Sequence, residues 1–114
     1  MRKITAYIHD CMTDKVADAL RDGNVHGVTF IKCEGFGRAA SPEDGGSYLD
    51  SDVEIGFAPK TKIEVICRSE ESDGIIEVIR DAAHTGRHGD GKIFVSGMLD
   101  VMDIRTGNRG EDVL

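Results

Sequence analysis

Hydrophobic and polar residues alternate along two stretches of the chain, and this alternation predicts two β-strands. In residues 3–8 and 61–67 every second side chain is apolar, which is the period of a strand with one buried face. In the second stretch, one face consists of Ile63, Val65 and Cys67, and the other of Lys62, Glu64 and Ile66. Three further segments are rich in β-branched or aromatic residues, which favour strands. They predict strands at 28–33 and 93–95 and a weaker one at 101–104.

Apolar residues recur every three or four positions in two other stretches, which predicts two helices. The first helix covers about residues 14–22, with Thr13 as its N-cap and Gly23 as its stop signal. The second helix begins after Ser69, a plausible cap, and ends at residues 85–86. The apolar positions of the two helices are Val16, Ala19, Leu20, Ile75, Ile76, Ile79 and Ala83.

The order of these elements predicts an α+β fold, the ferredoxin-like βαββαβ sandwich. Two helices would cover one face of the sheet, and we expect the other face, with Val28, Phe30 and Ile66, to meet another subunit. Residues 38–57 lack periodicity and are acidic and rich in glycine. A loop of this length inside a compact domain is usually functional or disordered.

Composition narrows the range of partners. The 114 residues carry 14 basic and 21 acidic side chains, a net charge of −7, and the length fits one domain. An acidic protein binds nucleic acids and anionic membranes poorly, so no nucleic-acid partner is expected. No stretch has the length of a membrane span or the apolar core of a signal peptide. We therefore expect no direct membrane insertion and a cytoplasmic location.

The cysteines and histidines do not form a metal-binding pattern. The chain has three cysteines, an odd number, and they are widely spaced: Cys11, Cys33 and Cys67. This pattern favours reduced thiols over disulfides or a zinc site. His84 and His88 are four residues apart, but the glycines among them predict a loop.

Three short segments combine glycine with a cation, and each lies at the end of a predicted strand. They are residues 35–38, 85–92 and 105–110. Glycines allow backbone N–H groups to converge on phosphate oxygens without interference from side chains, and Arg87 and Lys92 add positive charge. Taken alone, residues 85–92 fit a plain turn between helix and strand equally well.

These segments resemble the signature loops of the PII signal-transduction proteins. The run T-G-R-H-G-D-G-K-I-F-V (85–95) is similar to that family's B-loop, and E-G-F-G-R (34–38) to the start of its T-loop. F-A-P-K (57–60) resembles the return of the T-loop, and I-R-T-G-N-R-G-E-D-V-L (104–114) resembles the C-terminal loop. The chain is identified as a divergent member, a single domain over 1–114 with its T-loop at about 37–57, B-loop at about 85–92 and C-terminal loop at about 103–114.

The resemblance implies a function without catalysis. It implies a homotrimer that binds adenine nucleotide (ATP, ADP or AMP) in three clefts between subunits. The nucleotide would change the T-loop, which would regulate a target enzyme or membrane transporter in nitrogen, carbon or energy metabolism.

The resemblance also places individual residues at the nucleotide. Thr29 and Ile66 would lie beside the adenine, and Arg105 would reach the phosphates from the neighbouring subunit. Lys60 matches the lysine that the family uses toward the carboxylate of 2-oxoglutarate. The residues expected to hold the phosphates, or to lie in the glycine turns beside them, are Gly35, Gly37, Arg38, Gly89, Asp90, Gly91 and Lys92.

Three positions depart from the family pattern. Ala39 replaces a glutamine and has no oxygen to coordinate a cation, so the usual complex of magnesium, ATP and 2-oxoglutarate is not expected; another small carboxylate or bicarbonate is a possible co-ligand. Asp103 replaces an arginine, and its repulsion of a γ-phosphate predicts a preference for ADP or AMP over ATP. Tyr48 lacks the flanking pattern of the family's modified tyrosine and is interpreted as a partner-contact residue.

Two other functions remain open from the residues alone. A small nucleotide phosphohydrolase on the same fold would use His88 as its nucleophile or base, although no carboxylate or serine partner is identifiable. A trimeric metal-tolerance protein of similar architecture would use Cys11, Cys33 or His26 as ligands.

Overall fold

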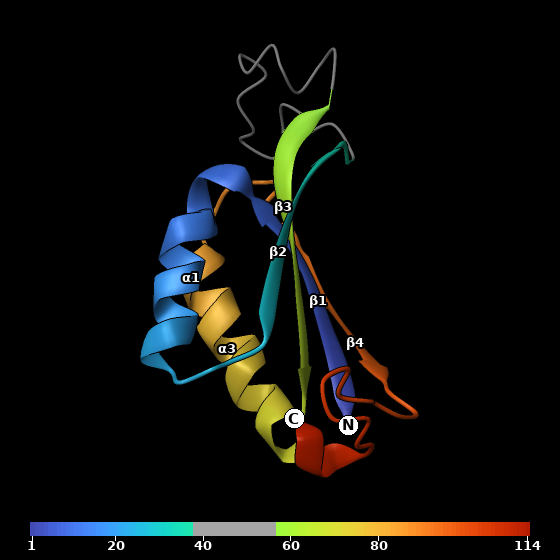
Figure 1. Ribbon diagram of the computed structural model, residues 1–114. Helices are drawn as coiled ribbons and strands as arrows, with labels where there is room; N and C mark the ends of the chain where they lie inside the picture. The colour runs from blue at the N-terminus through green and yellow to red at the C-terminus, as the bar shows by residue number, and fades with distance from the viewer. Residues whose placement is uncertain (38–56) are drawn as a thin grey trace.

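The computed structural model describes residues 1–37 and 57–114 (Figure 1). Its main elements are β1 (Arg2–His9), α1 (Thr13–Asp22), β2 (Val28–Gly35), β3 (Ala58–Cys67), α3 (Ser72–Ala83) and β4 (Lys92–Gly97). Short 3₁₀ turns lie at Asp10–Met12, Ser69–Glu71 and Glu111–Val113. The four strands form one antiparallel sheet in the order β2-β3-β1-β4. The predicted ferredoxin-like α+β fold is confirmed.

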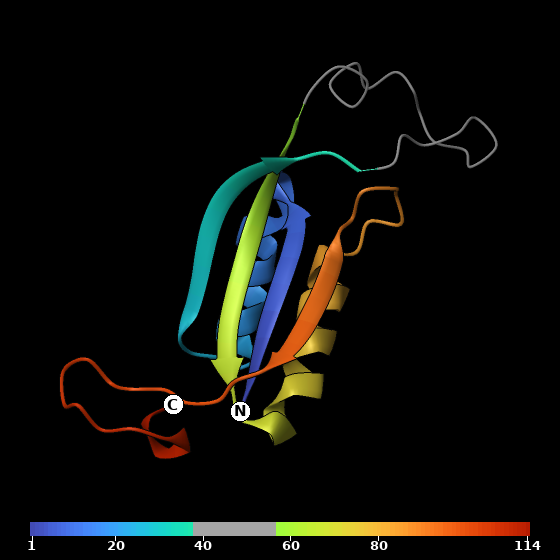
Figure 2. The same ribbon diagram turned by 90° about the vertical axis from the view of Figure 1, so that its right-hand side faces the viewer.

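Both helices pack on the same face of the sheet (Figure 2). The alternation within β1 and β3 explains this arrangement, because Ile4 pairs with Val65 and Ala6 with Ile63, so their side chains share one face. This face and the inner sides of the helices form the core. Its buried residues are Ile4, Ala6, Ile8, Val16, Leu20, Ile63, Val65, Cys67, Ile75, Ile79, Ala82 and Ala83.

The face opposite the helices, here called the open face, differs from the prediction in two residues. Val28 pairs with Val65 and Phe30 with Ile63, so both lie on the helix side, and their placement on the open face was wrong. The register of β2 against β3 decides this, and alternation within β2 alone does not reveal it. The large apolar residues of the open face in the described part of the sheet are Tyr7, Ile31, Ile66 and Phe94.

The two predicted N-caps were also wrong, whereas Gly23 is the C-cap of α1, as predicted. Thr13 lies inside α1, where its hydroxyl donates to the Asp10 carbonyl (2.8 Å) and is hydrogen-bonded to the Thr61 hydroxyl (2.7 Å). Ser69 opens a 3₁₀ turn, and its hydroxyl accepts a hydrogen bond from the N-terminal amine. A 3₁₀ turn precedes each helix, so the helix does not begin at the predicted residue. The hydroxyls of Thr13 and Ser69 form tertiary hydrogen bonds and do not cap a helix.

The C-terminal segment contains no strand over residues 101–104, contrary to the prediction. A single bridge joins Met102 to Arg109. The loop closes through backbone hydrogen bonds from Asp103 to Asn108 (2.8 Å) and from Gly110 to Val101 (3.0 Å). Residues 101–110 therefore form a hairpin-like arm outside the sheet.

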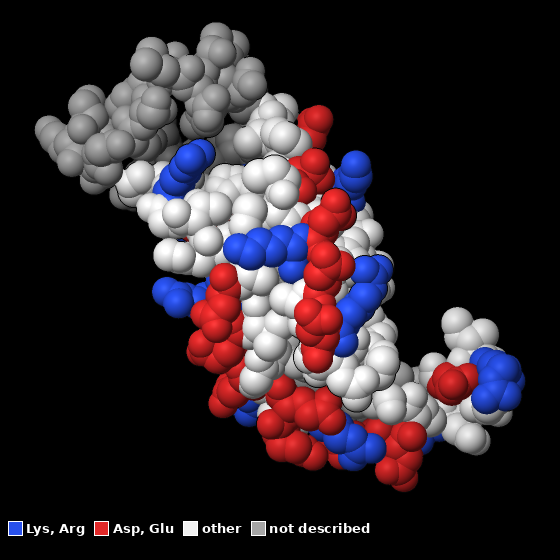
Figure 3. Space-filling view, turned by 90° about the vertical axis from the view of Figure 1, so that its left-hand side faces the viewer, with Lys and Arg blue, Asp and Glu red and all other residues white. Residues whose placement is uncertain are grey.

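Charged side chains cover the outer surface of the helix layer. Figure 3 looks onto this layer and shows acidic side chains along it, with basic ones among them. The exposed acidic residues of the two helices are Asp14, Asp18, Asp22, Asp73, Glu77 and Asp81. A surface of this kind favours contact with water. The open face, on the other side of the molecule, is the surface that exposes large apolar side chains of the sheet. In the described part of the chain, no helix is long and apolar enough to cross a membrane.

We predict that Gly91→Ala destabilises the protein. The φ angle of Gly91 is +110°, and a Cβ atom there would lie 1.7 Å from the Tyr7 carbonyl oxygen. A positive φ alone costs an ordinary residue about 1–2 kcal/mol, and the overlap also forces β4 away from β1. Urea denaturation at fixed protein concentration should show a loss of at least about 2 kcal/mol. Gly97→Ala is the matched control, because a Cβ there meets nothing within 4 Å; equal losses in both variants would contradict this explanation.

Candidate functional site

A cleft of about 710 Å³ opens on the sheet at the end where β1 finishes and β4 begins. Loop 85–91, between α3 and β4, forms one wall, and residues 33–37 form another. Tyr7 and Phe94 line the cleft from the sheet, with ring centroids 6.3 Å apart in an edge-to-face arrangement. The cleft brings together seven of the predicted site residues: Gly35, Gly37, Lys60, Gly89, Asp90, Gly91 and Lys92.

The carboxylate of Asp90 holds loop 85–91 in shape. It accepts hydrogen bonds from the backbone N–H groups of Thr85 (2.8 Å) and Gly86 (2.9 Å) and from the Thr85 hydroxyl. Gly86, Gly89 and Gly91 all have positive φ angles, which the loop needs in order to turn back on itself. Asp90, predicted as a ligand contact, is thus engaged within its own loop.

Burial raises the pKa of Asp90, but the hydrogen bonds from Thr85 and Gly86 outweigh it, and the pKa lies below its usual value. The stabilisation that this carboxylate provides is therefore complete above the ordinary aspartate pKa. It is lost as the pH falls through the lower pKa of the folded state.

Lys60 reaches into the same cleft from β3. Its ammonium donates to the carbonyl oxygen of Gly89 (2.6 Å) and lies 3.4 Å from Nδ1 of His9. Burial is the main cause that lowers the pKa of Lys60, although Asp90 opposes it. Lys60 is therefore a partly desolvated cation fixed beneath the loop, and its charge is available to an anion that enters the cleft.

His9 is a site residue that the sequence analysis missed. It pairs with Lys60 in the β1–β3 register, and its Nε2 lies 3.3 Å from the Asp90 carboxylate. Desolvation and then the Lys60 charge lower the pKa of His9, against the opposing effect of Asp90. The alternation of β1 extended to residue 9 places His9 on the open face, which is the signal that could have found it.

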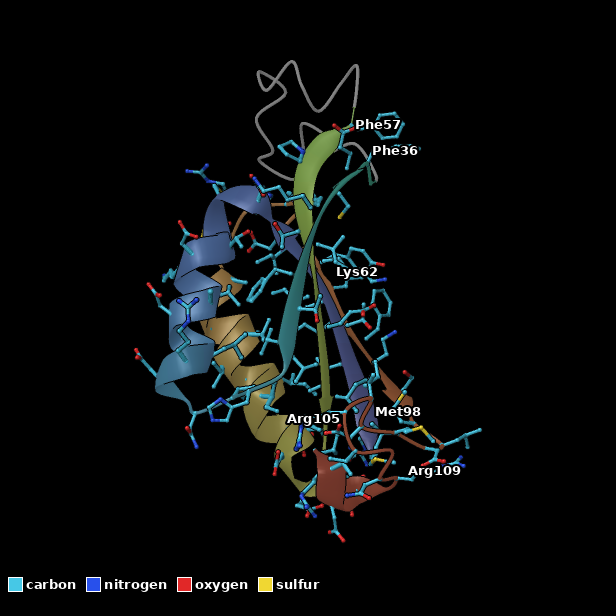
Figure 4. The ribbon with its side chains drawn as sticks, in the orientation of Figure 1. Phe36, Phe57, Lys62, Met98, Arg105 and Arg109 are labelled. Atoms are coloured by element: carbon cyan, nitrogen blue, oxygen red, sulfur yellow. The ribbon has the colours of Figure 1, made fainter. Side chains whose placement is uncertain are left out.

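The other predicted residues that the structure describes lie at the opposite end of the open face or in the C-terminal arm beyond it. Thr29 is the second residue of β2 and Ile66 the second-last of β3. Arg105 is labelled in Figure 4 and lies in the C-terminal arm. In Figure 2 this arm projects past the β2 edge of the sheet, at the end opposite loop 85–91. From Lys60 to Ile66 along β3 the distance is about 20 Å at the usual strand rise.

Asp103 shapes the arm that carries Arg105. Its carboxylate accepts hydrogen bonds from the backbone N–H groups of Arg105 (2.8 Å) and Thr106 (3.1 Å). Nearby, the Arg109 guanidinium pairs with Asp100, with Nε at 2.8 Å from the carboxylate. Arg109 is thus engaged by a carboxylate, and Arg105 is an exposed cation of the arm.

Some predicted residues lie outside the described part of the chain, namely Arg38, Ala39 and Tyr48. Phe36 and Phe57 flank that segment, and their rings are 5.5 Å apart. Both lie beside the start of β3 in Figure 4. The two phenylalanines bring the ends of the long loop together next to the cleft.

The comparison with known proteins decides the family. Residues 1–108 match the family model described as Nitrogen regulatory protein P-II. The chain belongs to the P-II family. A P-II protein of Rhizobium meliloti (strain 1021) is 41% identical over 114 residues, which is the full length of both chains. The Nitrogen regulatory protein P-II 2 of Methanothermobacter thermautotrophicus (strain ATCC 29096 / DSM 1053 / JCM 10044 / NBRC 100330 / Delta H) is 40% identical, over 97% of this chain and 95% of its own.

The structural comparison agrees. The crystal structure of Arabidopsis thaliana PII bound to citrate has a TM-score of 0.78 and 33% sequence identity to this chain, covering 97% of it and 89% of the plant chain. The P-II resemblance drawn from loop 85–95 is thereby confirmed, and the chain is a regulatory protein of this family. Family membership supports regulation over the phosphohydrolase and metal-tolerance functions. Within residues 1–37 and 57–114, no group of three or more His, Cys, Asp or Glu side chains is placed to hold a metal ion.

We predict that Asp90→Asn opens the P-II loop 85–91. An asparagine has one acceptor oxygen, so it cannot accept from both the backbone N–H groups of Thr85 and Gly86 and the Thr85 hydroxyl. A hydrogen bond to a charged group contributes about 1.5–3 kcal/mol. Hydrogen exchange of the Thr85 and Gly86 amides, followed by NMR, should accelerate about tenfold or more. Asp81→Asn is the control, because that carboxylate is exposed at the helix surface, where it pairs with its neighbour Arg80. Unchanged exchange in Asp90→Asn would show that the carboxylate does not hold the loop.

Proposed function

We propose that this P-II protein binds an adenine nucleotide between the subunits of a homotrimer and signals its occupancy through residues 37–57. The observation that carries the proposal is the separation of the predicted binding residues into two groups at opposite ends of one sheet face. A ligand that contacts both groups needs two copies of the chain.

A cyclic trimer offers such a contact, because its interfaces join different surfaces of neighbouring subunits. The loop 85–91 end of one open face would meet the C-terminal arm of the next subunit. The C-terminal segment supports this arrangement, since Ile104 in the arm and Leu99 just before it are completely exposed in the single chain. Apolar side chains in such positions are typical of an interface that a partner covers.

The chemistry of the cleft suits a polyphosphate. Arg87 and Lys92 line it together with Lys60, and this local positive charge stands out in a chain of net charge −7. Phosphate oxygens bind well to such cations and to backbone N–H groups in glycine-rich turns. The neighbouring subunit would contribute Arg105 to the phosphates, and Ile66 and Thr29 beside the adenine.

A small carboxylate or bicarbonate is a plausible co-ligand in the same cleft. The plant relative is bound to citrate, and here, within residues 1–37 and 57–114, the Lys60 ammonium contacts the neutral carbonyl of Gly89 and a nitrogen of His9. A carboxylate would offer this cation a stronger, charged acceptor.

The signal would leave through the long loop. Residues 35–37 line the cleft, and the Phe36–Phe57 contact closes the neck of the loop beside it. A ligand that shifts residues 35–37 would therefore reposition the loop, which would bind a target enzyme or transporter. The proposal includes a cytoplasmic location, where the three free thiols would stay reduced.

We predict that two binding-deficient variants complement each other. Lys92→Ala and Arg105→Ala should each weaken ADP binding at least about tenfold in calorimetry, since each removes a charged contact to phosphate. When the two variant chains are co-refolded, about a quarter of the clefts in randomly mixed trimers should contain both intact residues. Titration should then show high-affinity sites at about that stoichiometry.

The control for this experiment is the double variant, Lys92→Ala with Arg105→Ala, co-refolded with itself. It should show no high-affinity sites. Failure of the mixture to recover any such sites would contradict the intersubunit cleft, and absence of ADP binding by the unaltered protein would contradict the proposal as a whole.

We predict that Asp103→Asn reduces the preference for ADP over ATP. The substitution removes a negative charge that would face the γ-phosphate, while the amide oxygen can still accept the hydrogen bonds of Arg105 and Thr106. The ratio of the ATP and ADP dissociation constants should fall about threefold or more. Asp112→Asn, at an exposed carboxylate near the C-terminus, is the control. An unchanged ratio in Asp103→Asn would show that this carboxylate does not discriminate between the nucleotides.

A further inference from the structure

The imidazole of His9 lies between two charged groups of opposite sign. Its Nε2 is 3.3 Å from the Asp90 carboxylate, and its Nδ1 is 3.4 Å from the Lys60 ammonium. The ring also lies against the loop backbone, because a Cβ on Gly89 would come within 3.3 Å of its Cε1. A single side chain of β1 thus connects loop 85–91 to the cation of β3.

Only one neutral form of the ring satisfies both neighbours. An ammonium donates hydrogen bonds and accepts none, and an ionised carboxylate accepts them and donates none. Nδ1 must therefore carry the lone pair toward Lys60, and Nε2 must carry the hydrogen toward Asp90. The resulting chain of contacts runs from Asp90 through His9 to Lys60 and on to the carbonyl of Gly89.

Protonation of the ring would break one link of this chain. A hydrogen on Nδ1 removes the acceptor of Lys60 and places a second positive charge beside the ammonium. The contact with Asp90 would at the same time become a charged pair. Protonated His9 and a Lys60 ammonium held against Nδ1 are therefore mutually exclusive, whereas protonated His9 and a Lys60 drawn toward an anion are compatible.

We propose that His9 is a positioning residue that couples anion binding in this cleft to the uptake of a proton. In the unliganded protein, neutral His9 retains Lys60 beneath the loop. An anionic ligand draws Lys60 into the cleft, and the vacated Nδ1 takes a proton from water, with Asp90 as the counter-charge. This inference rests on the proposed nucleotide-binding function, and it adds a dependence on pH that the nucleotide site alone does not require.

The charged groups around His9 support this direction. Lys60 on β3 and Arg87 on the loop both oppose a charge on the ring, and Asp90 favours it. Cys11 and Cys33 lie near Lys60, and their effect is to raise the pKa of that ammonium. Burial first, and then the positive charges of Lys60 and Arg87, lower the pKa of His9 in the protein without ligand, and an added anion would raise it. Affinity then increases as the pH falls, by at most tenfold per pH unit for one coupled proton.

Calorimetry of ADP binding at pH 6.5 in two buffers of different ionisation enthalpy tests the coupling. The unaltered protein should take up a measurable fraction of a proton per ADP, beyond the uptake or release that ADP itself contributes. His9→Gln should remove this excess, since an amide does not titrate in this range. His26→Gln is the matched control, because that ring is exposed and contacts Asn24, and it should keep the excess.

NMR of the histidine rings in the unaltered protein provides an independent readout. His9 should be neutral with its hydrogen on Nε2, and both added ADP and the variant Lys60→Met should raise its pKa. Heat of ADP binding without a His9-dependent proton uptake, or a hydrogen on Nδ1 in the neutral ring, would overturn this inference alone. Absence of any ADP binding would contradict the proposed function as well.

Discussion

The antiparallel sheet keeps loop 85–91 and the C-terminal arm at opposite ends of one face, and ligand binding between subunits depends on this separation. Along β3 the strand geometry sets these two ends about 20 Å apart, so a ligand held at the loop lies far from the arm of the same chain as the structure places it. The chain provides two incomplete surfaces, one rich in cations and glycines and one with exposed apolar residues and Arg105. Assembly of several copies would complete both surfaces at once.

Within the cleft, the charged groups are partly buried, and each is positioned by a contact with the next or with the loop backbone. Asp90 fastens the loop through its own backbone, His9 meets that carboxylate from β1, and Lys60 meets the histidine from β3. The glycines make this compact arrangement possible, most clearly Gly91, which passes too close to the Tyr7 carbonyl for any side chain. The result is a local concentration of donors and cations in an acidic protein, which favours a phosphate or carboxylate ligand.

The fold was largely predictable from the sequence because its core rests on two simple periodicities. Alternation in β1 and β3 fixes the buried face, and the helical repeats fix the sides of α1 and α3 that cover it. The face of Phe30 was predicted wrongly because it depends on how β2 pairs with β3. The roles of Thr13 and Ser69 were predicted wrongly because their hydroxyls meet groups brought in by the tertiary fold or by a 3₁₀ turn.

The candidate site was only partly predictable, for a similar reason. Its motifs identified the family, but the contact between His9 and Asp90 joins residues 81 positions apart and leaves no local pattern. Native mass spectrometry with added ADP tests the central claim most directly. The account predicts a species of three 12.4 kDa chains that takes up at most three nucleotides, with no nucleotide on any single chain. A monomer that binds ADP, or a trimer that binds none, would contradict it.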